Sequence, residues 1–419
     1  MHITNIKILG LFKYLNYDIP LNQGINILHG INGKGKTTIL NIITNILNGD
    51  LTKFYHLSFK RIELVFDNGY LNIYRDESNK SKLLFDYKLG NDEFLKKDPS
   101  NTNSIKAFLS RLDIEPLLLP AQRVSIQETY HINNRDFDDD LIYHRKDMYL
   151  RDRFYRDNKN IFQPDPKMVD ILSIPRELIE RARRFSHITA TRFSKFDNLL
   201  FENFFEATLL AKVSNSTMEF KENEFVNMIE DIKEKKEKYF NKYKRVFMRS
   251  QLLEKIERLI TEESIYLNEQ IYKFLELYLR NIEKKNEIIS QYITPFTNLE
   301  KIINSLLQGK EIKLSMDENL HNIFKIITYG KDEIQVQHLS SGEKNLLLIF
   351  FHFLFEMKKN TLFMIDEPEL SLHIDWQYSL IENFQEYSND NQIFVVTHSP
   401  DIMQNHREYE INLDKCIIN

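Results

Sequence analysis

Residues 30–37 constrain the fold of this chain more than any other segment, because their sequence, GINGKGKT, has the spacing G-x-x-x-x-G-K-T. The segment follows an apolar, strand-like run at Ile25–Leu28 and precedes a helix-like run at Thr38–Leu47. Glycines in such a loop allow consecutive backbone N–H groups to point at one anion at the start of a helix, where the helix dipole also favours negative charge. The sequence therefore predicts a strand, a phosphate-binding loop (P-loop) and a helix in direct succession, which is a unit of an α/β fold.

Two side chains of this loop are expected to contact a bound nucleotide. Lys36 is predicted to contact the β- and γ-phosphates, and the hydroxyl group of Thr37 is predicted to help hold Mg²⁺. The full set of predicted nucleotide-binding residues in the loop is Asn32, Gly33, Lys34, Gly35, Lys36, Thr37 and Thr38. Because kinases, GTPases and ATPases share loops of this kind, the loop alone chooses neither the nucleotide nor the reaction.

A pair of acidic residues near the C-terminal end narrows the choice. Asp366 and Glu367 directly follow the apolar, strand-like run Leu362–Ile365. A carboxylate at the end of a buried strand beside a P-loop is a magnesium ligand in nucleotide hydrolases, so Asp366 is predicted to hold Mg²⁺ together with Thr37. Glu367, the next residue, is predicted to act as a general base or to orient the attacking water.

Three further segments carry a resemblance to the ABC-type ATPases. Their sequences are LSSGE at 339–343, SLH at 371–373 and VVTHSP at 395–400. They resemble the signature motif, the D-loop and the switch-histidine segment of that family, and they occur in the family's order around Asp366 and Glu367. The resemblance implies that the nucleotide is ATP, that Mg²⁺ is the cofactor and that two copies of the chain form each complete ATP site.

The same resemblance assigns roles to four residues. Ser340, Gly342 and Glu343 would contact the γ-phosphate of ATP held by the second copy, because the signature opens a helix whose N-terminus favours an anion. His398 would sense the γ-phosphate of the site. The chain differs from the usual signature at Ser341, where the family has glycine, and at Glu343, where glutamine is usual.

The position of the Q-loop, which links the magnesium site to the helical lobe in ABC ATPases, is less closely defined. Gln122 follows the strand-like run PLLLP and is the candidate for that role, including a contact with ATP and Mg²⁺, while Gln127 is a competitor. Arg123 is a candidate for a phosphate contact. Phe12 or Tyr14 is a candidate for stacking on adenine, although core packing explains either aromatic side chain as well.

The distance along the chain between the motifs indicates a branch of the family. Lys36 and Ser340 lie 304 positions apart, which resembles the RecF, SMC and OLD group and disfavours a transporter subunit. The blocks HLSSGEKNLLLIF, LFMIDEPELSLHIDWQ and QIFVVTHSP resemble the compact OLD-like ATPase subunits of anti-phage defence systems such as PARIS, Septu and certain retron systems. The resemblance implies an ATPase that controls a separate effector, and a RecF/SMC-like DNA-binding ATPase of repair or recombination is the alternative.

The expected fold class is α/β: an ABC ATPase head, made of a P-loop core sheet and an antiparallel β subdomain, with an inserted all-helical lobe or short arm. Alternating apolar residues around Asn68-Gly69 predict a β-hairpin, and the glycine-free span Pro175–Gln308 has helical periodicity. The expected domains are 1–130 for the N-terminal part of the head, 131–310 for the insertion and 311–419 for the C-terminal part of the head.

Composition is consistent with a folded protein, with 42% hydrophobic residues and a net charge of −5. The longest apolar stretch, Leu346–Phe355, is shorter than the roughly 20 residues that span a bilayer, and it predicts a buried helix. The single cysteine, Cys416, can form neither an internal disulfide nor a cysteine zinc site. We therefore expect a soluble, cytoplasmic protein without a membrane partner.

Basic residues cluster at the start of the helical span, where a nucleic-acid contact and an ordinary solvated or protein-binding helix face are both open interpretations. Glu177 and Glu180 lie near this cluster and weaken the first interpretation. The basic residues are Arg176, Arg181, Arg183, Arg184 and Arg192.

A nuclease active site is not expected in this chain. Only 21 residues follow His398, too few for the Toprim domain of OLD-type nucleases, and the acids of 135–157 alternate with basic residues as in a solvated loop. The aromatic residues of 133–166 lie among charged residues, which is typical of a protein interface. We expect a separate effector, a nuclease or toxin, to dock there, and a homodimer or a higher even-numbered oligomer. The aromatic residues are Tyr143, Tyr149, Phe154 and Tyr155.

Overall fold

The computed structural model describes residues 1–76, 78, 82–90, 92–97, 108–121, 169–211, 269–314, 323–388 and 390–418. The chain divides into two compact units. The first combines Met1–Leu172 with Val336–Asn419, and the second is Ser173–Gln335. The predicted P-loop, signature, acidic pair and switch histidine therefore all belong to the first unit, although about 300 residues separate the P-loop from the other three.

A five-stranded parallel sheet forms the centre of the first unit. Its middle strands are buried along their whole length, as expected for strands covered on both faces. Because the strands are parallel, the segments that follow β3, β12 and β13 emerge at one edge of the sheet. The strand order is β14 (Glu410–Asn412), β3 (Ile25–His29), β13 (Gln392–Val396), β12 (Thr361–Asp366) and β8 (Glu115–Leu119).

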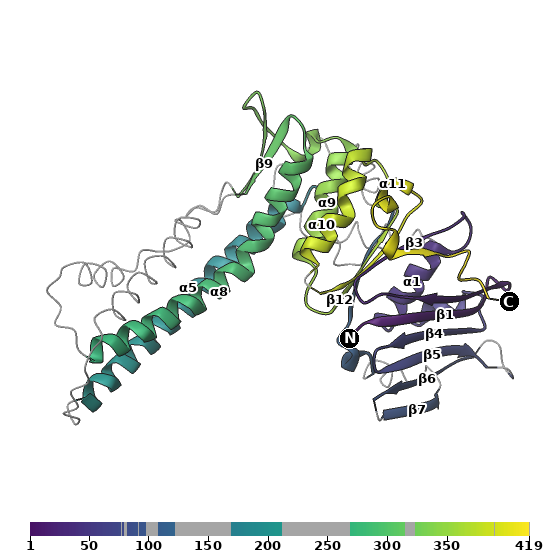
Figure 1. The fold of residues 1–419 in the computed structure, drawn as a ribbon, viewed down its shortest axis with the longest axis horizontal. Coiled ribbons are helices and arrows are strands. Elements are labelled where there is room, and N and C mark those ends of the chain that lie inside the picture. Colours follow the sequence, from purple (N-terminus) through teal and green to yellow (C-terminus); the bar gives the residue numbers. More distant parts are fainter. Residues whose placement is uncertain are drawn as a thin grey trace, which may run out of the picture. The chain divides into compact units, whose positions relative to one another are not determined.

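A six-stranded antiparallel sheet forms the second layer of this unit, and its strands lie one beside the next in Figure 1. Buried and less buried residues alternate along β4, which matches a strand with one face on the core. The hairpin between β4 and β5 needs glycine at Gly69, since an added Cβ would lie 1.9 Å from the carbonyl oxygen of Lys88. The order is β2 (Leu15–Pro20), β1 (Ile3–Leu11), β4 (Arg61–Phe66), β5 (Gly69–Arg75), β6 (Leu83–Leu89) and β7 (Asp92–Lys97).

Helix α1 (Lys36–Leu47) buries its apolar side chains in the core that both sheets share. Helix α9 (Ser341–Phe355) is buried along most of its length, and its Phe353 ring packs within 5.2 Å of Phe363 and 4.7 Å of Phe384, measured between ring centroids. Further helices described in this unit include α10 (Ile374–Tyr387), α11 (Pro400–Met403) and the 3₁₀ turns η1 (Thr52–Tyr55), η3 (Val336–His338) and η4 (Arg407–Tyr409).

The described part of the second unit comprises two 38-residue helices and a small sheet, and the helices run side by side in Figure 1. Phe185 of α5 stacks on Tyr292 of α8, and Asn281 donates a hydrogen bond to the carbonyl oxygen of Phe196, which makes the pair antiparallel. At about 1.5 Å per residue, each helix is about 57 Å long. The elements are α5 (Ile174–Ala211), α8 (Glu269–Leu306), β9 (Lys310–Leu314), β10 (Phe324–Thr328) and β11 (Glu333–Ile334).

The fold class expected from the sequence is confirmed: an α/β head with an antiparallel sheet and a helical insertion. Helix α1 begins at Lys36, two residues before the expected start, because Gly35 serves as its N-cap. The inserted unit extends to Gln335 rather than 310, since β9 is tied to α8 through two hydrogen bonds between Asn304 and Ile312. The expected effector-docking segment 133–166 lies outside the described residues. Among the described helices, none is long and apolar enough to cross a membrane.

Candidate functional site

The loop between β3 and α1 has a backbone that only glycine adopts readily at two positions. Gly33 and Gly35 have φ angles of 79° and 80°, in the left-handed region. Gly35 caps the helix, and its carbonyl oxygen accepts the N–H of Ile39 at 2.9 Å. The first N–H groups of any α-helix lack an acceptor within the helix, and such a terminus favours an anion.

Lys36 is the first residue of α1, and its side chain is 6% exposed. Its Nζ donates hydrogen bonds to the carbonyl oxygens of Gly30 at 2.8 Å and Ile31 at 3.3 Å, so the ammonium group lies within the curve of the loop. Burial lowers the pKa of Lys36, and the negative charges of nearby carboxylates, led by Glu367, oppose that shift. Lys36 is thus held by the P-loop backbone, with its ammonium group near the carboxylates of Asp366 and Glu367.

Thr37 and Asp366 are brought together across 329 positions of sequence. The hydroxyl group of Thr37 donates to Oδ2 of Asp366 at 2.7 Å, and Asp366 is 3% exposed at the end of β12. A hydroxyl and a carboxylate are hard oxygen donors, the type that Mg²⁺ prefers. The donor set and the position of the pair beside the loop therefore fit a magnesium ion.

Glu367 has a backbone conformation that is unusual for its residue type. Its φ angle is 45°, and its N–H donates to the carbonyl oxygen of Val396 at 2.8 Å. A left-handed conformation in a residue other than glycine is maintained only when neighbouring structure imposes it. Here the hydrogen bond to β13 imposes it, and the chain turns sharply away from the sheet directly after Asp366.

Glu369 is a site residue that the sequence analysis did not single out. Its Oε1 accepts the backbone N–H of His398 at 2.7 Å and that of Ser399 at 3.2 Å. The carboxylate thus ties the turn after β12 to the turn after β13, which carries the predicted switch histidine. The second glutamate of the run DEPE was the available signal, because an acid so close to Asp366 must lie at the same edge of the sheet.

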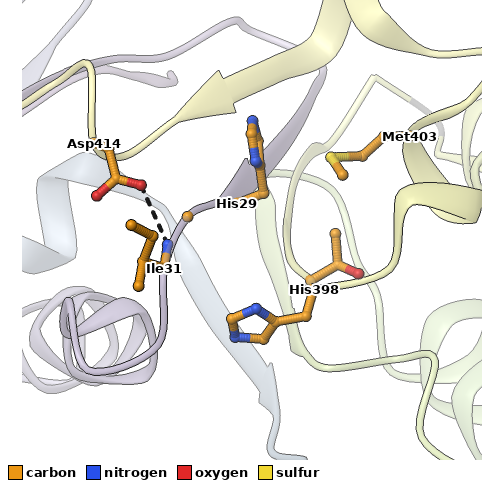
Figure 2. A pocket seen from close by; sticks show the side chains of 7 residues that line it. His29, Ile31, His398, Met403 and Asp414 are labelled. Carbon is orange, nitrogen blue, oxygen red and sulfur yellow. Dashed lines mark hydrogen bonds between the residues drawn. The ribbon is translucent and has the colours of Figure 1, made fainter.

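A pocket of about 250 Å³ opens between the start of the P-loop, the turn after β13 and the segment after β14. Figure 2 shows the imidazole of His398 directed into this space, across from Ile31. His29, at the end of β3, has its Nε2 2.6 Å from a carboxylate oxygen of Glu410. The lining residues are His29, Gly30, Ile31, Thr397, His398, Met403 and Asp414.

Two residues that the sequence analysis missed brace the P-loop. Asp414 accepts the N–H of Ile31 at 3.2 Å (Figure 2), and its other carboxylate oxygen lies 3.9 Å from Nζ of Lys34. The hydroxyl group of Tyr17 donates to the carbonyl oxygen of Lys34 at 2.8 Å. Burial, followed by the negative charge of Asp414, raises the pKa of Tyr17 to about 12, so the phenol keeps its proton. Nothing in the local sequence indicates either contact, because both depend on the pairing of distant segments.

The predicted signature residues begin α9 with a capping box. Ser340 is the N-cap; its Oγ accepts the N–H of Glu343 at 3.3 Å, and the Glu343 carboxylate accepts the N–H of Ser340 at 2.7 Å. This reciprocal pair gives a physical reason for glutamate at 343. The exposed Ser340 hydroxyl still has its proton to donate, whereas the Glu343 side chain is buried in the cap.

Gly342 brings the signature helix against the segment that resembles the D-loop. An added Cβ at Gly342 would lie 2.3 Å from the carbonyl oxygen of Ser371 and 3.2 Å from the ring of Trp376. Asn345, one turn further along α9, donates to the carbonyl oxygen of Leu370 at 2.7 Å. The signature and the D-loop segment are therefore packed as one piece, and only glycine fits at 342.

Of the two aromatic candidates for adenine contact, Phe12 lies beside the P-loop. It has a φ angle of 52°, and a Cβ added at Gly35 would lie 3.2 Å from its ring. Tyr14 is 70% exposed. Gln122, Arg123 and Gln127 lie outside the described residues, so the Q-loop assignment of Gln122 stays a prediction.

The site therefore combines a P-loop, an oxygen pair suited to Mg²⁺, a glutamate directly after that pair and a histidine across a pocket. Comparison with protein families gives one match, to a family described as AAA ATPase domain, over residues 1–403. No curated protein matches the sequence.

Solved structures similar to this chain include SMC head domains. One is an Smc head domain with an extended coiled coil, bound to the C-terminal domain of ScpA, from Pyrococcus furiosus: 16% identity, TM-score 0.40, covering 96% of this chain and 91% of that chain. Another is the SMC head domain from Thermotoga maritima: 12% identity, TM-score 0.38, covering 96% and 92%. With TM-scores below 0.5, these structures give no evidence on the function of this chain.

Proposed function

The chain belongs to the AAA ATPase domain family, and on that premise we propose that it binds ATP on the loop 30–38 and hydrolyses it with Mg²⁺. The observation that carries the proposal is the 2.7 Å contact between the Thr37 hydroxyl and the Asp366 carboxylate. It joins the start of α1 to the end of β12, the two places from which P-loop ATPases hold magnesium. Mg²⁺ held by these residues would neutralise charge on the phosphates.

Lys36 and the N-terminus of α1 would bind the β- and γ-phosphates. The ammonium group now donates to two loop carbonyls, and phosphate oxygens would replace these acceptors at short range, with a charge-assisted gain. The left-handed conformations of Gly33 and Gly35 would let N–H groups of the loop turn toward the same anion.

Glu367 would orient the attacking water or accept its proton. Its left-handed backbone directs the chain away from β12 immediately after the magnesium-binding pair. His398 would contact the γ-phosphate from across the pocket, where its ring lies (Figure 2). Glu369 would act as a positioning residue, because it holds the backbone of His398 and does not itself belong to the phosphate-binding set.

The complete site would be formed by two copies of the chain. Ser340 is exposed at the N-terminus of α9, with its hydroxyl proton available, and such a helix N-terminus favours an anion supplied from outside. Exposed apolar side chains flank the adjoining D-loop segment, with Leu370 42% and Ile374 51% exposed. A second copy bound across ATP would cover them.

The resemblance to OLD-like ATPases supports the further proposal that ATP-driven closure controls a separate effector in anti-phage defence. The expected docking segment, 133–166, stays a prediction, as does the expectation that this chain has no nuclease activity. Co-purification with the product of a neighbouring nuclease or toxin gene would support a separate effector. Nuclease activity of the purified chain that survives Glu367→Gln would contradict the proposal that the chain acts only through such an effector.

The ATP site is tested by calorimetry on Lys36→Ala, with Lys358→Ala as the matched control. Lys36→Ala should abolish ATP binding in a folded protein, while Lys358→Ala should retain it, because Lys358 lies on the surface before the start of β12, with its Nζ 3.2 Å from Glu115. Ser340→Arg should bind ATP but neither dimerise nor hydrolyse it. Normal ATP affinity in Lys36→Ala would refute the site, and normal hydrolysis by Ser340→Arg would refute the two-copy arrangement.

A further inference from the structure

Helix α5 carries an exposed run of cations that the proposed ATPase activity does not use. Within residues 181–196 there are five arginines and lysines and no acidic residue. The helix buries Leu178, Ala182 and Phe185. The residues that form its exposed basic face, as the term is used below, are Arg183, Arg184, His187, Arg192 and Lys195.

No side chain that the structure describes supplies a counter-charge to the basic face. Arg181, just before it, is paired with Glu177 at 4.0 Å, and Arg280 on α8 is paired with Glu276. Among the described residues, none forms an ion pair with an arginine or lysine of the basic face. The two acids that weakened a nucleic-acid interpretation of the sequence, Glu177 and Glu180, both precede the face by at least three residues.

The neighbouring helix does not neutralise the face either. The part of α8 that packs beside it runs from Asn281, bonded to Phe196, to Tyr292, stacked on Phe185. Its charged residues balance: Glu283, Lys284, Lys285 and Glu287. Like charges three or four positions apart, such as Arg192 and Lys195, destabilise a helix. An anion from outside the chain would offset that repulsion.

We propose that the basic face of α5 binds the phosphodiester backbone of a nucleic-acid duplex. From residue 183 to residue 195 the face extends about 18 Å along the helix axis, more than the roughly 12 Å width of the B-form major groove. Cations at the two ends of the face therefore reach phosphates on both sides of one groove. The side chains contact phosphates and not base edges, so the binding is independent of sequence.

Two other anionic partners fit the face less well. A membrane surface binds helices that also insert an apolar side, but the apolar side of α5 packs in the cluster formed by Phe185, Ile289 and Ile293. An acidic protein interface is typically built around a buried apolar or aromatic centre, and the exposed positions of the face are basic or small and hydroxylated, such as Ser186 and Thr191.

The test is fluorescence anisotropy of the full chain with labelled duplex DNA and duplex RNA of the same sequence, titrated with salt. Each phosphate contact contributes about 0.9 to the slope of log affinity against log salt concentration. The quadruple variant Arg183→Gln, Arg184→Gln, Arg192→Gln, Lys195→Gln should lower that slope by three to four. When salt rises from 50 to 200 mM, the affinity of the wild-type chain should therefore fall by a factor about 100 times larger than the affinity of the variant does. The DNA and RNA arms decide which duplex is preferred.

The matched control neutralises four lysines of the β9–β11 sheet, at positions 310, 313, 325 and 331, and should leave affinity and slope close to wild type. Circular dichroism and ATP hydrolysis without nucleic acid verify that both variants are folded. The proposal is overturned if the wild-type chain binds neither duplex at about 50 mM salt, or if the quadruple variant keeps its affinity and slope. It is equally overturned if binding to anionic vesicles or to polyglutamate requires the basic face while binding to duplexes does not.

Discussion

Charged side chains are used in opposite ways in the two units of this protein. In the unit that carries the P-loop, carboxylates accept hydrogen bonds from backbone N–H groups of the same chain. Glu369 accepts from the turn of His398, Asp414 from the P-loop and Glu343 from the start of the signature helix. On the basic face of α5, the arginines and the lysine are exposed and form no ion pair with a described residue.

The difference separates two tasks. A carboxylate that accepts backbone hydrogen bonds fixes a turn in one position, which chemistry at a phosphate requires. A cation without a counter-ion fixes nothing in its own chain and is available to an external anion. Substitutions in the first unit should therefore change rate constants or ATP affinity, and those on α5 should change salt-dependent association only.

Among variants that still bind ATP and dimerise, the largest effect is expected from Glu367→Gln. Amide replacement keeps the size of the side chain but removes the base, so the turnover number should fall by about 10² to 10⁴-fold while ATP still binds. The variant should accumulate as an ATP-bound dimer in size-exclusion chromatography with ATP and Mg²⁺. Glu367→Gln with an unchanged turnover number would assign the water-orienting role to another residue.

A smaller effect is expected when Glu369 is changed, because it acts through the turn of His398. Glu369→Ala should lower the turnover number by about 10- to 100-fold, as a displacement of a catalytic group does, with ATP affinity nearly unchanged. Glu369→Gln retains an acceptor oxygen for the N–H groups of His398 and Ser399, so it should recover most of the activity.

A double-mutant comparison separates positioning from general stability. In a His398→Ala background, Glu369→Ala should cost little further activity, because the group it positions is already gone. If the losses of activity were additive in the double variant and Glu369→Ala also lowered the melting temperature, Glu369 would have a purely structural role.

The pH dependence of ATP binding sharpens the comparison further. Burial lowers the pKa of Lys36, while bound phosphates favour its charged form. ATP affinity should therefore be highest below the lowered pKa and fall as pH rises through it, at a lower pH than for an ordinary lysine. Lys36→Arg, whose guanidinium stays charged, should bind more weakly but lose this alkaline decline, as calorimetry across the alkaline range would reveal. If ATP affinity declined equally with pH in the wild type and in Lys36→Arg, deprotonation of Lys36 would not be the cause of the decline.

The sequence predicted the parts of this structure that depend on local pattern. Glycine spacing and flanking apolar runs located β3, the P-loop and α1, and the run before Asp366 located β12, because parallel strands in a covered sheet are continuously apolar. The expected fold class followed from the order of these motifs.

Contacts between distant segments were not predictable in the same way. Asp414 reaches Ile31 only because β14 pairs with β3, and Tyr17 reaches Lys34 only because β2 lies at the edge of the second sheet. The end of the inserted unit at Gln335 depends likewise on β9 bonding to α8. The local sequence gives no signal for such pairings, which are set by tertiary packing.

The smallest effect is expected for one of these missed contacts. Tyr17→Phe removes the hydrogen bond to the carbonyl oxygen of Lys34 and should lower the free energy of unfolding by about 1 kcal/mol, with a modest loss of ATP affinity. Because the folded-state pKa of Tyr17 is raised to about 12, its contribution is complete below the usual tyrosine pKa of about 10 and is lost as pH rises toward 12. Wild-type stability in urea should thus decline over that interval more steeply than that of Tyr17→Phe. Tyr70→Phe, which leaves the Tyr17 contact intact, is the control, and identical alkaline slopes in wild type and Tyr17→Phe would show that this phenol does not brace the P-loop.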